Sequence, residues 1–226
     1  MEFDLTPYFR QYEALSQAAD QVFEKIKSEF AECVKCEREC ADCCHALFDL
    51  TLIEAMYLNA RFKARVGDKT RETVLEKANR ADRTIHKLKR KAFKDLQSGR
   101  EEGDILTDLA AEKVRCPLLN DKDLCDLYDH RPITCRLYGI PTSIGGLGRT
   151  CALSGFEGGH QYPTVDIDKI HGRLQEISAE LLRDIRSQHI KLVDLLMPLS
   201  MALLTEFDDG FLGVANEDDD REGGAP

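Results

Sequence analysis

The sequence predicts a mainly α-helical protein, with a helical domain and an irregular cysteine-rich loop region closed around a metal site. Apolar residues recur at helical spacing in several long segments, whereas prolines and glycines interrupt that spacing between residues 116 and 160. All nine cysteines fall into two sets along the chain. Because 226 residues can bury an adequate core without metals or disulfides, thiols gathered in this way indicate metal chemistry.

The first expected element is an amphipathic helix from Phe3 to Ala31, begun at Thr6 and Pro7. The opening residues, 1–17, carry acidic and polar side chains and no continuous apolar stretch, so no secretory signal is indicated. We therefore expect a cytoplasmic protein, in which thiols stay reduced and serve metals rather than disulfides.

The helix runs directly into the first cysteine set, which is packed into twelve residues: Cys33, Cys36, Cys40, Cys43 and Cys44. At about 100° per residue, a continued helix would place all five thiols in one arc about 100° wide. We therefore expect a helical thiol stripe over residues 33–44.

Two further helices are expected before the second cysteine set. Leu50 to Phe62 reads as a buried helix, with Asp49 or Thr51 as its N-cap and Glu54 closing a capping box. A basic helix over residues 68–96 is sparse in apolar residues and mostly solvated.

Charge is distributed unevenly along the chain. The net charge is −10, which argues against a nucleic-acid binder, yet residues 61–100 carry fourteen Lys or Arg and five Asp or Glu. The basic helix is expected to be either a solvated face or a docking surface for an acidic protein or for the chain's own acidic tail.

The second half of the chain is expected to hold an irregular segment, 116–160, and a C-terminal helix over residues 166–207 with a break near Pro198. Residues 1–209 would form a single domain, and residues 210–226 a disordered acidic tail. The most apolar run, Leu192 to Leu204, is too short to span a membrane.

The second cysteine set comprises Cys116, Cys125, Cys135 and Cys151. Four thiolates hold either zinc or an iron–sulfur cluster, and nine cysteines could supply one site or two. A buried thiolate site needs cationic or amide donors. Basic residues flank the cysteines and are candidates for that role: Lys35, Arg38, Arg115, Arg131, Arg136 and Arg149.

Two histidines and one glycine-rich segment are weaker candidates. His45 and His130 could act as nitrogen ligands, although a capping or solvent role fits them better. Residues 139–150 could cradle a phosphate, but they lack the lysine of a P-loop, so we expect a loop that reaches Cys151 around the metal.

The order and spacing of the cysteines are specific to a known family. CEREC-ADCC at residues 36–44, CPLL at 116–119, CDLYDHRPITCRLYG at 125–139 and a last Cys151 resemble the YkgJ-type CxxCxxCC family, a zinc- or iron-chelating domain. The resemblance covers roughly half of the chain, and Cys33 is an addition to the pattern. It implies eight metal ligands, namely Cys36, Cys40, Cys43, Cys44, Cys116, Cys125, Cys135 and Cys151.

The function that we expect is a metal-binding protein that holds an iron–sulfur cluster with a redox or electron-transfer role. A structural zinc-binding module that mediates protein interaction is the first alternative. A methyltransferase-like enzyme, related to the flagellin lysine methylase that the resemblance brings in, is the second. Enzymatic activity is left open, since no catalytic residue and no dinucleotide fingerprint is indicated.

Overall fold

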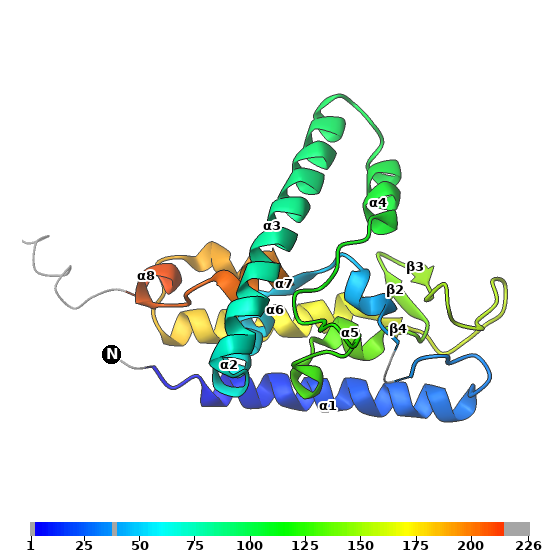
Figure 1. Cartoon of the computed structure of the whole chain (residues 1–226), viewed down its shortest axis with the longest axis horizontal. Coiled ribbons are helices and arrows are strands. Elements are labelled where there is room, and N and C mark those ends of the chain that lie inside the picture. Colours follow the sequence, from blue (N-terminus) through cyan, green and yellow to red (C-terminus); the bar gives the residue numbers. More distant parts are fainter. Residues whose placement is uncertain (1–2, 38–39, 215–226) are drawn as a thin grey trace, which may run out of the picture.

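The computed structural model describes residues 3–37 and 40–214 and confirms a mainly helical fold with irregular cysteine-rich loops. Helix α1, Thr6–Glu29, lies along one side of the molecule (Figure 1). The Asp4 carboxylate accepts a hydrogen bond from the Thr6 amide at 2.9 Å. Pro7 follows in the first turn, where a missing amide leaves no helical hydrogen bond unmade.

Helix α1 shares an apolar core with α2 (Leu52–Arg65), α5 (Ile133–Leu137) and α6 (Ile167–Asp184). Helix α2 begins after Thr51 as expected, and the buried Glu54 carboxylate accepts a hydrogen bond from the Thr51 backbone, as in the predicted capping box, and from other elements as well. The Glu54 carboxylate accepts the Ile133 amide at 3.1 Å and the Tyr12 hydroxyl at 3.4 Å. Glu54 therefore joins α1, α2 and the start of α5.

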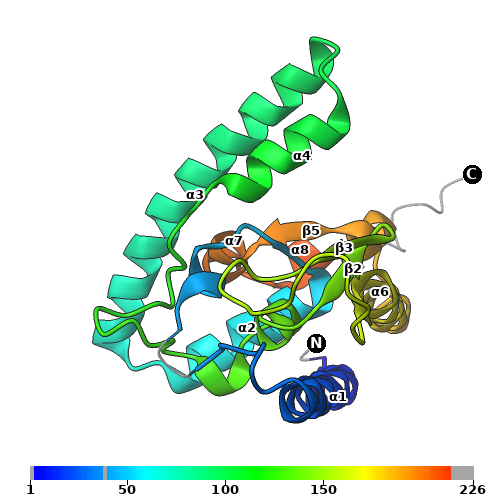
Figure 2. The same cartoon turned by 90° about the vertical axis from the view of Figure 1, so that its right-hand side faces the viewer.

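The second half of helix α3, Asp68–Gln97, projects from the rest of the molecule, and α4, Glu102–Ala111, returns beside it (Figures 1 and 2). Only Val74, Ala78 and Ala81 of α3 are buried, all in its first half. The second half is covered on one side by α4, a helix that the sequence analysis missed. The basic helix is thus largely solvated, as predicted.

Two small sheets, neither of them predicted, fasten distant segments. Strand β1, Asp49–Thr51, pairs antiparallel with β5, Leu196–Pro198. In the second sheet β2, Thr142–Ile144, lies between β3, Leu147–Arg149, and β4, Val165–Asp166. Gly145 and Gly146, at φ +58° and +75°, form the turn between β2 and β3. Most residues other than glycine would be strained at these backbone angles.

The single helix predicted over residues 166–207 is wrong. Helix α6 ends at Asp184, and Arg186 adopts φ +52°. The chain then forms the 3₁₀ helix η3 (Ile190–Asp194), β5 and α7 (Leu199–Leu204), which Pro198 precedes rather than kinks. Apolar residues of all these elements pack into the two cores, so helical spacing persists across breaks in the backbone.

The folded chain also extends past the domain end expected at residue 209. Helix α8, Asp209–Leu212, buries Leu212. The Ser187 hydroxyl donates to the Leu212 carbonyl at 2.5 Å. The rest of the expected acidic tail, residues 215–226, lies outside the described residues. Among the helices described, none is both long and apolar enough to cross a membrane.

Candidate metal centre

The thiol stripe predicted on a helix over residues 33–44 is wrong. The chain is irregular from Cys33 to Cys40 in its described part, and only Asp42–His45 forms a short 3₁₀ helix, η1. The Cys116 amide donates to the Cys44 carbonyl at 2.7 Å, and the Val114 amide donates to the His45 carbonyl at 3.0 Å. These backbone bonds hold the two cysteine segments together, whereas a continued helix would carry the first segment onward along the axis of α1 (Figure 1).

Six thiols from the two segments line one cavity that is open to solvent. We call this cavity the thiol chamber. Its cysteines are Cys40, Cys43, Cys44, Cys116, Cys125 and Cys135. All nine cysteines of the chain are free and half-buried, so no disulfide competes for these sulfurs.

Cys36 and Cys151, the outer thiols, lie beside the chamber without lining it. The Cys36 thiol donates to the Tyr138 carbonyl at 3.4 Å, and the Cys151 thiol donates to the Asp42 carboxylate at 3.6 Å. Burial first, then the neighbouring thiols Cys40, Cys43 and Cys151, raise the pKa of Cys36 to about 11. The outer thiols are therefore electrostatic neighbours of the chamber.

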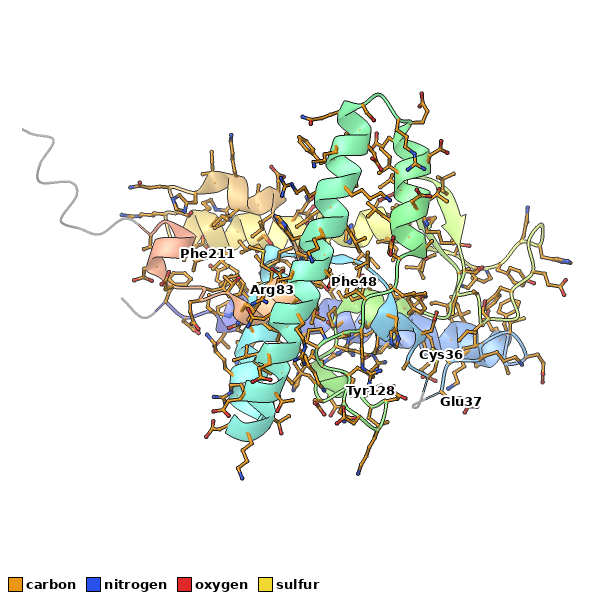
Figure 3. All side chains as sticks on the ribbon, turned by 45° about the horizontal axis from the view of Figure 1, so that its top comes forward. Cys36, Glu37, Phe48, Arg83, Tyr128 and Phe211 are labelled. Carbon is orange, nitrogen blue, oxygen red and sulfur yellow. The ribbon has the colours of Figure 1, made fainter. Side chains whose placement is uncertain are left out.

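Gly139 makes room for one outer thiol. It adopts φ +104°, and a β-carbon there would lie 3.0 Å from the Cys36 sulfur. Another side chain at this position would meet both backbone strain and the sulfur. Figure 3 shows Cys36 toward the end of α1, apart from Phe48 beside α3.

Cys33 stands apart from the other eight. It packs against the first apolar core, and its carbonyl accepts the Gly155 amide at 2.8 Å. This environment is that of a small apolar side chain.

Three cysteines of the second segment each meet the backbone amide two residues ahead. Burial raises the pKa of Cys116 to about 12 and that of Cys125 to about 11, and the amides of Leu118 and Leu127 act in the opposite direction. The Leu153 amide donates to the Cys151 sulfur at 3.4 Å. Amides aimed at sulfur favour the thiolate, which is the form that binds metals.

A tight turn between Cys116 and Cys125 positions these two cysteines. Leu119 and Cys125 pair across the turn, and the Asn120 side chain accepts the amides of Lys122 and Leu124 at 2.9 Å and 3.1 Å. The Asn120 side chain thus replaces backbone partners that a turn of this length leaves unsatisfied.

Cys43 is the sulfur at which negative charge is most stabilised. The sulfurs of Cys43 and Cys44 lie 4.0 Å apart. Hydrogen bonds from the thiols of Cys135 and Cys44 lower the pKa of Cys43, and the Arg131 guanidinium acts in the same direction. The same hydrogen bonds raise the pKa of Cys44 and of Cys135.

Among the basic residues predicted to stabilise the metal site, Arg131 is the best placed to stabilise a negatively charged centre. It lines the chamber, and its guanidinium stacks on the Tyr128 ring at 4.0 Å. Its Nε is buried and has no hydrogen-bond partner in the described part of the chain. An unpaired donor beside thiols fits an anionic guest.

The other predicted cations have different surroundings. Arg136 binds Asp20 at 2.5 Å and the carbonyls of Arg131 and Asp129, so it holds the loop. Arg115 lines the chamber and pairs with Asp123 at 3.0 Å. Lys35 and Arg149 are exposed, and Arg38 lies outside the described residues.

Neither candidate histidine lines the chamber. His45 Nδ1 lies 3.0 Å from the Ala41 carbonyl, and His130 Nδ1 lies 3.0 Å from the Tyr57 hydroxyl. Sequence reasoning missed Asp42 and Tyr138, which contact the outer thiols. The position of Asp42 directly before Cys43 is the only signal that could have found it.

The types of the side chains suit a metal ion, but their positions in the described part of the chain do not form a complete metal site. Thiol donors suit zinc, iron and copper(I). Yet within residues 3–37 and 40–214, no group of three or more Cys, His, Asp or Glu side chains is arranged to hold a metal ion. Cys43 nevertheless hydrogen-bonds both Cys44 and Cys135, so three of the six chamber thiols are in contact.

Residues 35–152 match the model of the CxxCxxCC family, whose description reads "Putative zinc- or iron-chelating domain". The match spans just over half of the chain, contains eight cysteines and begins after Cys33. The resemblance noted in the sequence is thereby confirmed. Neither the curated proteins nor the solved structures gave a significant match.

Proposed function

Because the chain belongs to the CxxCxxCC family of zinc- or iron-chelating domains, we propose that it holds an iron–sulfur cluster in the thiol chamber and transfers electrons. One observation carries the proposal. Six thiols line a single cavity, and no three potential ligands in the described residues are gathered for one ion.

The number of thiols around one cavity supports a cluster over a single zinc ion. A tetrahedral site with Zn–S bonds of about 2.3 Å needs sulfurs about 3.8 Å apart. The Cys43–Cys44 separation of 4.0 Å comes close to this value and Cys135 also contacts Cys43, but six thiols around one cavity exceed the four that a zinc ion takes. A cluster binds each thiolate through a different iron atom, so its ligands can stand around a cavity.

The surroundings of the chamber suit the charge of such a group. Four thiolates around an oxidised four-iron cluster leave a net charge of about −2, which needs donors when it is buried. The amides of Leu118 and Leu127 and the unpaired Nε of Arg131 are donors of this kind. When bound, the cluster would supply one-electron redox chemistry.

We propose a division of labour among the eight cysteines. The six cysteines that line the chamber would supply its ligands, namely Cys40, Cys43, Cys44, Cys116, Cys125 and Cys135. Cys36 and Cys151 already bond to protein oxygens, so they would support the centre through Cys40 and Asp42. Cys33 would not take part.

The basic face of α3 is the surface that we propose for an acidic protein partner. Arg83, Lys87, Arg90 and Lys94 recur every three or four residues and so share one face (Figure 3 labels Arg83). Their side chains have no hydrogen-bond or ion-pair partner among the described residues, which leaves them available. Binding through this face would weaken steeply as salt rises.

Anaerobic purification tests the cluster. The protein should be brown, should contain iron and acid-labile sulfide, and should lose its visible absorption band on reduction with dithionite. A colourless protein with stoichiometric zinc and no sulfide would instead support the structural zinc module.

A further inference from the structure

A basic groove runs beside the thiol chamber, between α3 and the segment 113–116. Its lining contains four basic side chains, Lys77, Arg80, Lys113 and Arg115, and no acidic one. Such a lining favours an anionic group.

Three of the four basic side chains already pair with aspartates that do not line the groove. Lys77 lies 3.7 Å from Asp121, Lys113 lies 3.3 Å from Asp42, and Arg115 lies 3.0 Å from Asp123. In the part of the chain that is described, the Arg80 side chain forms no hydrogen bond or ion pair. Arg80 is thus a free cation in a basic lining.

The thiol chamber adjoins this groove. Ala81, Val114, Arg115 and Cys116 line both, so the groove and the chamber meet at these residues. Away from its thiols the chamber is mostly apolar, with Phe48, Ile85 and Leu199 in its wall. Apolar cavities with a few polar groups at one end are typical of small-molecule sites.

We propose that the chamber and the groove together bind an amphipathic organic anion. Its carboxylate or phosphate headgroup lies in the groove at Arg80, and its apolar part enters the chamber. The inference rests on the proposed function only in placing the apolar part against the cluster. An inorganic anion would leave the apolar wall wet, and a neutral chain would leave Arg80 without a partner.

Calorimetry on the anaerobically purified protein tests the site with octanoate and octyl phosphate as probes. Two controls each lack one feature of the probes: octanol lacks the charged headgroup, and inorganic phosphate lacks the apolar chain. At least one anionic probe should bind about tenfold more tightly than either control, because it makes both kinds of contact. The preferred probe distinguishes carboxylate from phosphate. Equal binding of octanol, or no binding of either anionic probe, would overturn the inference.

Two charge reversals on α3 make a matched pair. Arg80→Glu should weaken the preferred probe at least about tenfold, since it places a like charge at the headgroup. Lys91→Glu makes the same change in charge on the same helix outside the groove and should leave affinity within about twofold. Equal losses in both variants would indicate a general charge effect and would contradict the site.

Iron and sulfide are measured on the same samples. A protein that contains the cluster and binds no probe disproves the ligand site alone. A protein that binds the probe and contains no iron disproves the cluster alone, because Arg80 and the apolar wall do not depend on it.

Discussion

The thiol chamber and the outer thiols are neighbours built for different tasks. Chamber sulfurs come from two segments joined at Cys44 and Cys116, and they face a cavity. The outer thiols, Cys36 and Cys151, instead donate to a carbonyl and to a carboxylate. Thiols that face a shared cavity can accept a guest, whereas thiols that donate to protein oxygens support their surroundings.

The largest expected effect is at Cys135, a chamber thiol that interacts with Cys43. Cys135→Ser should lower metal affinity more than the roughly 10- to 100-fold cost of losing an outer-shell partner. Iron content and the visible band, measured after anaerobic purification, check this. A variant with a normal iron content would remove Cys135 from the ligands.

Cys151→Ser should have a smaller effect. The serine hydroxyl can still donate to Asp42, so the cluster should form but should be lost to a chelator roughly tenfold faster. Chelation kinetics followed by absorbance measure the difference. If Cys151→Ser loses iron as completely as Cys135→Ser, the distinction between chamber and outer thiols fails.

Arg131 should tune the chamber without holding the metal. Arg131→Gln removes a positive charge beside Cys43, so the reduction potential should fall by on the order of tens of millivolts. Arg131→Lys keeps the charge and should recover most of that shift. An unchanged potential in Arg131→Gln would place the guanidinium outside the field of the centre.

Glu54 joins the helices α1, α2 and α5, so its titration offers a test of how these helices are held together. Burial raises the pKa of Glu54 from 4.5 to about 7. Between these values the folded chain binds the proton more tightly than the unfolded chain, so the free energy of unfolding decreases as the pH rises through this window. The loss is on the order of 3 kcal/mol at most.

Glu54→Gln removes this proton-linked loss. Relative to the parent, the variant should therefore be more stable at pH 8 than at pH 5, as urea unfolding can measure. The same stability difference at both pH values would mean that the Glu54 carboxyl titrates normally.

Cys33 should give the smallest effect. It lies outside the family match and packs against the first core. Cys33→Ser should leave iron content and the visible band unchanged. Loss of the cluster would make Cys33 a ninth functional thiol.

Part of this architecture was predictable from local pattern. The helices that became α1, α2 and α3 begin close to capping or proline signals, and their apolar spacing is regular. The cysteine spacing identified the family. These features depend on residues near one another in the chain.

The rest depends on contacts that local spacing does not contain. Residues 33–44 fit a helical projection, but backbone bonds from Val114 and Cys116 hold the segment in an irregular path. Apolar spacing likewise continues past Arg186, because separate elements fill the same cores. The chamber itself arises only where these distant segments meet.

X-ray absorption at the iron edge of the anaerobically purified protein tests the cluster in the chamber most directly. We expect a first shell of sulfur and a second shell of neighbouring iron, both strongly reduced in Cys135→Ser. A single metal ion with four sulfur ligands and no metal neighbour would contradict it.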